Sequence, residues 1–262
     1  MTETARGPIH VALLGLGEAG TAFAVDLIAL GVPTAGWDPV QDRSVSGLRR
    51  AASAAGAVEE ADLVLSLNSG ASAVRAAEAA APALSPRTLF ADLNTTGIAV
   101  KRDIAAAVKS AGASFADVAL LAPVPGRGIR TPALASGDGA ARYAEMLGSL
   151  GAAVDVVGAE PGAAAARKLL RSVFMKGLAA SVLESLAAAE AAGCADWLRA
   201  DIEATLRDAD ASLVDRLVEG SAQHAVRRIA EMEAAADLLR ELGVEPHVAT
   251  ASVDVLRGVR DA

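Results

Sequence analysis

Residues 9–20 read Ile9-His10-Val11-Ala12-Leu13-Leu14-Gly15-Leu16-Gly17-Glu18-Ala19-Gly20, an apolar run that ends in three spaced glycines. A helical stretch follows over residues 21–30, and a second apolar run stops at Asp38. In this order, the first glycine allows a tight turn and the second lets the backbone approach a pyrophosphate. The third lets the helix pack closely on the strand. The stretch therefore predicts a dinucleotide site at the start of a parallel sheet.

The expected cofactor is NAD. The helix N-terminus presents N–H groups and a positive dipole end to phosphates. Asp38, 18 residues beyond Gly20, suits a ribose diol and repels a 2′-phosphate. Arg43 lies close by and could reverse that preference, so NADP stays possible. The alternative is a turn that only packs a helix, and it leaves Asp38 unexplained. The expected cofactor-binding residues here are Gly15, Leu16, Gly17, Glu18, Ala19, Gly20 and Asp38.

Composition narrows the function further. The chain has 262 residues and a formal net charge of −8, which argues against a nucleic-acid partner. No run of about 18 uncharged apolar residues appears, so no membrane span is expected. Met1 to Pro8 lacks the apolar segment of a secretory signal, and Cys194 is the only cysteine, so a cytoplasmic setting is expected. Three scattered histidines show no zinc spacing, and no metal site is expected.

The chain divides into two parts. Up to residue 158, apolar runs alternate with helical segments, which indicates βαβ units and a mainly parallel sheet. After Gly158 to Gly162 the pattern is helical almost to the end. We therefore expect an α/β fold, a Rossmann-type doubly wound domain over 1–158, and an all-α domain over 159–262. Expected strands are 9–14, 34–37, 63–67, 88–93, 114–121, 133–135 and 153–157. Expected helices are 21–30, 44–55, 71–81, 97–111, 139–150, 163–192, 195–209, 213–242 and a last one from Ala249.

Several motifs resemble the β-hydroxyacid dehydrogenase superfamily, which includes 3-hydroxyisobutyrate and 6-phosphogluconate dehydrogenases. They are the glycine turn, Asp92-Leu93-Asn94-Thr95-Thr96, Asp117 with Ala122-Pro123-Val124-Pro125-Gly126, and the segment from Gly162 to Ser172. The resemblance covers nearly the whole chain. Its C-terminal part looks most like the branch whose helical domain is a domain of unknown function.

The resemblance implies that Lys168 is the catalytic lysine and that Pro125 and Gly126 belong to a substrate-binding loop. Ser172 stands where the family has Asn, and Pro125 stands where it has Ser. Proline offers neither a hydroxyl nor an N–H to an anion, so the usual substrate does not carry over. Decarboxylating members have a Glu where this chain has Met175.

Hydride transfer to or from an alcohol also moves a proton, so a general acid/base is needed near the reacting oxygen. Lys168 fits this role. Ser172 and Lys176 follow it at i+4 and i+8, so one helix face carries two amines and a hydroxyl. We expect both to bind an anionic substrate, although a solvated polar stripe is the plain alternative.

Asn94 and Thr95 follow one expected strand and Asn68 and Ser69 follow another, at the edge where ligands of parallel sheets bind. We expect Asn94 to touch substrate and the other three to touch cofactor, with a helix cap as the alternative for Asn94. Other candidates are Arg127 and Arg130 as an anion clamp, and His224 on a C-terminal helix. For these the structural alternatives, a surface loop and an ordinary helix histidine, are kept.

The sequence thus predicts an oxidoreductase that transfers a hydride between NAD(P) and the alcohol or ketone carbon of a small hydroxy acid or related anionic alcohol. Imine reductases share the two-domain plan, so an NADPH-dependent imine reductase is an alternative. They usually lack the lysine, so the presence of Lys168 speaks against this alternative. A protein that binds NAD without turnover is another. Aromatic residues make up only 3% of the chain, and the long helix is rich in alanine, which favours a homodimer built through the helical domain.

Overall fold

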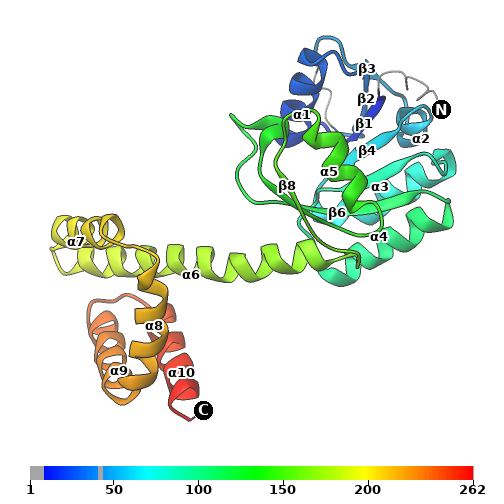
Figure 1. Cartoon of the computed structure of the whole chain (residues 1–262). Coiled ribbons are helices and arrows are strands. Elements are labelled where there is room, and N and C mark those ends of the chain that lie inside the picture. The colour runs from blue at the N-terminus through cyan, green and yellow to red at the C-terminus, as the bar shows by residue number, and fades with distance from the viewer. Residues whose placement is uncertain (1–8, 41–43, 262) are drawn as a thin grey trace. The chain divides into compact units, whose positions relative to one another are not determined.

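The computed structural model describes residues 9–40 and 44–261 (Figure 1). They form two compact units, residues 1–171 and 172–262. The division falls inside helix α6 (Ala163–Ala191), further along the chain than the expected boundary after residue 158.

The first unit is built on one sheet of eight strands within the described residues. They are β1 (Val11–Leu14), β2 (Thr34–Trp37), β3 (Arg49–Arg50), β4 (Leu63–Ser66), β5 (Leu89–Asp92), β6 (Ser114–Leu120), β7 (Ala133–Ser136) and β8 (Val154–Gly158). The strand order is β3-β2-β1-β4-β5-β6-β7-β8, and every pair is parallel except β6 with β7. The order reverses between β1 and β4, which is where doubly wound sheets open a ligand crevice at their carboxyl ends. The expected mainly parallel Rossmann-type sheet is confirmed.

Helices cover both faces of this sheet (Figure 1). They are α1 (Glu18–Ala29), α2 (Ala54–Val58), α3 (Ala73–Ala80), α4 (Ile98–Ser110) and α5 (Ala140–Gly148). Because side chains alternate along a strand, β1 sends Leu13 into a core with α1 and α5, and Leu14 into a core with α2, α3 and α4. Tyr143 of α5 is fully buried in the first core, and this burial raises the pKa of its hydroxyl above its ordinary value. Strands β1, β4 and β5 are therefore buried on both faces.

The helix expected over residues 44–55 is wrong. The chain there forms the two-residue strand β3, which extends the sheet beyond β2, and α2 begins only at Ala54. Gly47 has φ +85°, and a Cβ there would lie 2.8 Å from Cγ2 of Ile28, so the backbone turns tightly against α1. Ser53 then starts α2 by accepting a hydrogen bond from the Gly56 N–H.

The second unit is all-helical, as expected, with α7 (Ala195–Arg207), α8 (Ser212–Gln223), α9 (Ala225–Glu241) and α10 (His247–Arg260). α6 ends before Gly193, whose φ is +71°. The single helix expected over 213–242 is wrong, because the chain breaks at His224. There α9 turns back on α8 so closely that a Cβ on Gly220 would lie 3.0 Å from the Arg228 guanidinium.

One helix of the described residues, α6, is long and apolar enough to cross a membrane by length and composition alone. Lys176 and Glu184 interrupt its apolar sequence. The Glu184 carboxylate accepts the N–H groups of Val248 and Ala249, at 2.7 and 2.9 Å, at the start of α10. α6 is thus tied to the helices that follow it, and a single helix of this kind is weak evidence for a membrane span.

Candidate active site

The glycine turn after β1 has the close packing and the open side that a dinucleotide needs. A Cβ on Gly15 would lie 2.3 Å from the Leu67 carbonyl oxygen, and one on Gly20 would lie 2.0 Å from that of Gly15. A Cβ on Gly17, by contrast, would meet nothing within 4 Å. Gly17 is also the N-cap of α1 and caps it with no side chain. The turn therefore fits a pyrophosphate, with the α1 N-terminus facing the open space.

Asp38 lies just beyond the end of β2 and reaches the same turn. Its carboxylate accepts the Leu16 N–H at 2.7 Å and the Val40 N–H at 2.8 Å. The guanidinium of Arg50, on β3, donates to the Asp38 carbonyl oxygen at 3.0 Å. A carboxylate and a guanidinium thus stand together beside the turn, while Arg43 lies outside the described residues.

A cavity of about 460 Å³ opens beside the turn, within the first unit. Its lining comes from the carboxyl ends of β4, β5 and β6, from the first turn of α1 and from α6. The lining residues are Glu18, Ala19, Leu67, Asn68, Leu93, Asn94, Thr95, Leu120, Ala122, Pro123, Val124, Pro125 and Lys168. Seven of the site residues expected from sequence therefore share one cavity: Glu18, Ala19, Asn68, Asn94, Thr95, Pro125 and Lys168.

Lys168 and Asn94 are two polar residues that line this cavity. The Lys168 amine donates to the Thr95 hydroxyl at 2.8 Å. Asn94 is 5% exposed, and its amide nitrogen donates to the Asp92 carboxylate and to the Ser66 hydroxyl. The Asn94 Oδ1 has no hydrogen-bond partner among the described residues. Since Gly97 is the N-cap of α4, Asn94 does not cap that helix.

The remaining expected site residues do not line this cavity. The Ser69 hydroxyl donates a hydrogen bond to the Ser72 hydroxyl at 3.1 Å. Gly126 directly follows Pro125 and has φ +77°. Ser172 and Lys176 belong to the second unit. Arg127 and Arg130 flank a short turn that packs on α1, where the Ile129 N–H donates to Asp26 at 3.0 Å. His224 lines a separate small cavity of the second unit with Arg227 and Arg260.

A row of buried polar residues crosses neighbouring strands of the sheet, and the sequence did not predict that these residues lie together. Ser66, Asp92, Asp117 and Ser136 are register partners across β4, β5, β6 and β7, and all four are fully buried. Lys101 of α4 is equally buried and pairs with both carboxylates. The sequence does contain a sign of this row, an aspartate in each of two apolar strands, Asp92 in β5 and Asp117 in β6. It does not show that one lysine contacts both.

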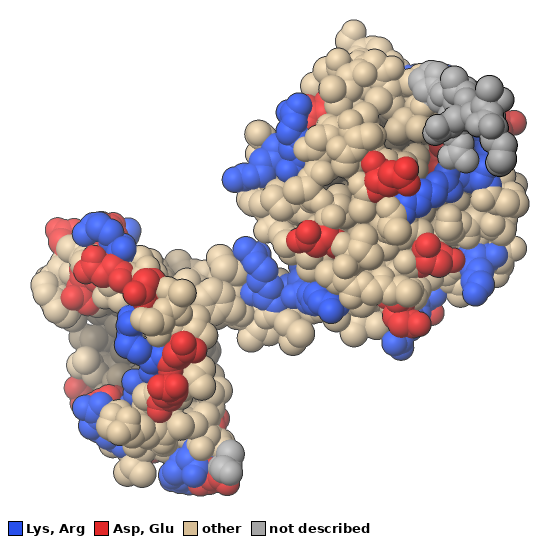
Figure 2. Space-filling view, in the orientation of Figure 1, with Lys and Arg blue, Asp and Glu red and all other residues tan. Residues whose placement is uncertain are grey.

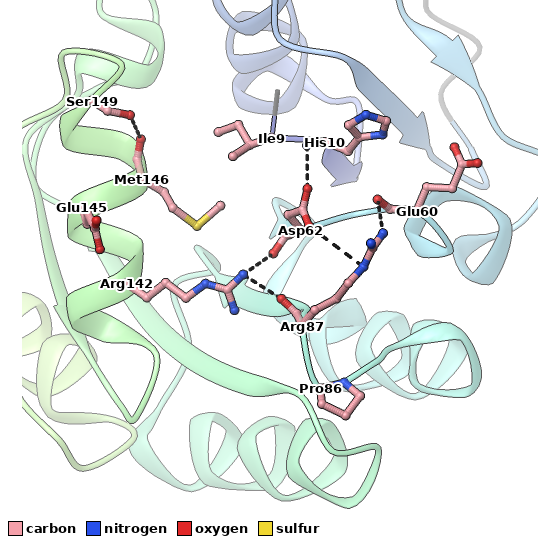
Figure 3. Close-up of a pocket in the computed structure, with 10 residues that line it drawn as sticks. All are labelled: Ile9, His10, Glu60, Asp62, Pro86, Arg87, Arg142, Glu145, Met146 and Ser149. Carbon is pink, nitrogen blue, oxygen red and sulfur yellow. Dashed lines mark hydrogen bonds and ion pairs between the residues drawn. The ribbon is translucent and has the colours of Figure 1, made fainter. Parts of the chain in front are cut away.

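A second and larger cavity, of about 1170 Å³, lies at the opposite, amino edge of the sheet (Figure 3). Its lining includes His10 and Asp62, which directly precede β1 and β4, Arg87, two residues before β5, and Arg142 of α5. Arg142 donates to the carbonyl oxygens of Arg87 at 2.6 Å and Asp62 at 3.4 Å, and Arg87 donates to that of Glu60 at 3.1 Å (Figure 3). Arg142 and Arg87 thus connect α5 with the segments that precede β4 and β5. This cavity is separate from the glycine turn, which lies at the carboxyl edge of the sheet.

The fold and the glycine turn define a Rossmann-type dinucleotide-binding protein. Residues 10–158 match the family model described as the NAD binding domain of 6-phosphogluconate dehydrogenase, and residues 189–259 match a domain of unknown function, DUF1932. The chain belongs to this NAD-binding family of 6-phosphogluconate dehydrogenase-like oxidoreductases, and its cofactor is NAD(P).

Solved structures share this fold. A conserved hypothetical protein from Sinorhizobium meliloti 1021 is 31% identical, with a TM-score of 0.63, over 95% of this chain and 87% of that chain. A Streptomyces aurantiacus imine reductase is 20% identical, with a TM-score of 0.80, over 95% and 93%. An Aspergillus terreus reductive aminase, solved with NADPH and ethyl levulinate, is 20% identical, with a TM-score of 0.79, over 98% and 95%. The two 20% likenesses show the fold alone. No curated protein matches the chain.

Proposed function

We propose that this protein is an NAD(P)-dependent dehydrogenase of a small hydroxy acid or related anionic alcohol, with Lys168 as the general acid/base. The observation that carries the proposal is one cavity that joins the glycine turn, the Lys168 amine and the buried Asn94. The family supplies the cofactor, and the cavity supplies the Lys168 amine for a second, small molecule.

When bound, the nicotinamide supplies or accepts the hydride. Lys168 handles the accompanying proton: its amine takes the proton from an alcohol as the carbon loses hydride, and its ammonium returns one to a carbonyl oxygen in the reverse direction. As a cation it also stabilises negative charge on that oxygen. Thr95, at 2.8 Å, holds the amine at the cavity wall.

The remaining groups fit a polar substrate. Asn94 lines the cavity, and because its Oδ1 is buried we propose that it contacts the substrate as part of the cavity wall. Pro125 lines the cavity with Pro123 and Val124, in a stretch without a side-chain donor, and Gly126 stays a proposed substrate contact. Ser172 and Lys176 stay proposed substrate contacts, and Leu16, Ser69 and Asp38 stay proposed cofactor contacts.

Imine reduction is the second candidate. The likeness to an imine reductase, with a TM-score of 0.80 over nearly the whole chain, favours it as a matter of fold. A lysine that donates a proton to a carbonyl oxygen favours the dehydrogenase instead, because an iminium carbon accepts hydride without such a donor.

We also propose that the working form is a homodimer built through the helical unit. α8 has no buried residue, and its apolar Val214, Leu217 and Val218 lie at i, i+3 and i+4 with more than half of each side chain exposed. α6 adds Val173 and Phe174, which are 74% and 64% exposed. A second copy would cover this surface.

The test is a substrate panel with matched lysine variants. Oxidation of small hydroxy acids with NAD or NADP, and reduction of keto acids and cyclic imines with NADH or NADPH, are followed by absorbance of the reduced nicotinamide. Lys168→Ala should lower kcat by about 100-fold or more and leave NADH affinity unchanged. Lys109→Ala, at an exposed position of α4, should change neither.

Each other outcome has a definite meaning. Full activity of Lys168→Ala would refute its role. Turnover of imines alone would establish the second candidate, and cofactor binding without turnover of any compound would leave a non-catalytic NAD(P)-binding protein.

A further inference from the structure

The Lys101 ammonium is fully buried; it donates two hydrogen bonds to Asp92 and forms an ion pair with Asp117. It lies 2.7 Å from Oδ2 and 2.9 Å from the carbonyl oxygen of Asp92, and 2.9 Å from Oδ1 of Asp117. A buried ammonium that contacts two buried carboxylates offsets part of their charge, and both ion pairs hold it in place. With no exposed surface, Lys101 cannot meet a ligand, so its role is to hold these neighbours in place.

The two carboxylates that contact Lys101 also bond different parts of the site: Asp92 bonds Asn94, and Asp117 bonds the start of α6. Asp92 accepts the Asn94 amide, which fixes the direction of the free Asn94 Oδ1. Asp117 uses its other oxygen, Oδ2, to accept the Ala165 N–H at 2.9 Å and the Ser136 hydroxyl at 3.1 Å. The Ser136 hydroxyl oxygen accepts the Ala164 N–H at 3.0 Å.

Ala164 and Ala165 belong to the first turn of α6, where backbone N–H groups have no partner within the helix. Asp117 and Ser136 therefore cap α6 from the sheet, and the carboxylate also faces the positive end of the helix dipole. Lys168 stands four residues after Ala164 and three after Ala165, so it lies one turn further on the same face. Gly162, with φ +97°, leaves no room between this turn and Ile98 of α4.

We propose that Lys101, Asp117 and Ser136 form a positioning relay for the active-site amine: by fixing the first turn of α6, they set where the Lys168 amine meets Thr95. The proposal rests on the function given to Lys168 above. It assigns the relay no contact with cofactor, because the glycine turn and Asp38 sit on β1 and β2, at the other side of β4 and β5.

Two readouts test the relay without any substrate. The first is amide hydrogen exchange at Ala164 and Ala165 by ¹⁵N NMR, since each of these amides is held by only one relay bond. The second is the rate at which acetic anhydride acylates the Lys168 amine as a function of pH, read by mass spectrometry. The main variant is Ser136→Ala, which removes one hydroxyl, and the second is Asp117→Asn.

Ser136→Ala should speed exchange at Ala164 by about tenfold and shift the pH profile of Lys168 acylation, with NADH affinity within twofold of the parent protein. Asp117→Asn should do the same at Ala165. The matched control is Ser114→Ala, at the start of β6 and away from α6, where the hydroxyl makes one long bond of 3.5 Å to Thr88. It should change neither readout.

The relay is refuted if exchange quickens while Lys168 acylation keeps its profile, because the row would then be merely structural. It is also refuted if neither readout moves. If Asp117→Asn does not fold, Ser136→Ala decides alone. Absence of dehydrogenase turnover would remove the proposed function and leave this result readable, because neither measurement uses a substrate.

Discussion

Asp38 joins the end of β2 to the glycine turn by accepting the Leu16 N–H, and its charge is what should distinguish the cofactors. Asp38→Asn keeps the size of the side chain and removes the charge. Because a charged hydrogen bond is worth about 1.5–3 kcal/mol, the Kd of NADH should rise about tenfold or more and that of NADPH should rise less. Fluorescence titration of the reduced cofactors measures both. Asp103→Asn, on the exposed side of α4, is the control, and equal losses for the two cofactors would contradict the role of Asp38.

At the scale of the element, the turn from β1 into α1 uses its glycines for two different purposes. Gly20→Ala would place a methyl 2.0 Å from the Gly15 carbonyl oxygen, so it should lower the free energy of unfolding by about 1–3 kcal/mol or more. Gly17→Ala places its methyl in open space, so stability should change by less than about 0.5 kcal/mol. The same methyl intrudes where the pyrophosphate is expected, so NADH affinity should fall. Urea unfolding and NADH titration separate the two effects, and a Gly17→Ala protein with normal affinity would contradict the expected phosphate position.

At the scale of the whole molecule, the exposed apolar residues of the second unit predict self-association. Basic and acidic residues are intermixed on the face of this unit seen in Figure 2, so neither sign of charge dominates there. Val218→Asp puts a charge into the apolar surface of α8 and should weaken the dimer by about 100-fold. Sedimentation or light scattering across concentrations measures the change.

The matched control for this change is Val40→Asp, in the first unit, where the valine is 82% exposed. This variant should associate as the parent chain does. A parent chain that stays monomeric at tens of micromolar, or a Val218→Asp chain that stays dimeric, would refute the proposed interface.

The sequence by itself determined the sheet, the glycine turn and the long helix after Gly162. These follow from local order: an apolar run ends in spaced glycines, and alanine-rich segments continue without proline. It also selected Asn68, Asn94 and Thr95, because residues that follow parallel strands meet at one edge, and Lys168 through the resemblance to a known family. Two expected helices were wrong for reasons that are not local: β3 forms by pairing with β2, and α9 turns back on α8 at His224.

Only the tertiary structure decided which polar groups are buried together. Asp92, Lys101 and Asp117 are far enough apart in sequence that no periodicity relates them. The register of β5 with β6 and the first turn of α4 nevertheless bring the Lys101 ammonium within 3 Å of both carboxylates. Their link to α6 likewise depends on the Ala164 and Ala165 amides reaching two strands. A buried charge is stable only with its partners in place, and those partners exist only once the sheet and both helices have assembled.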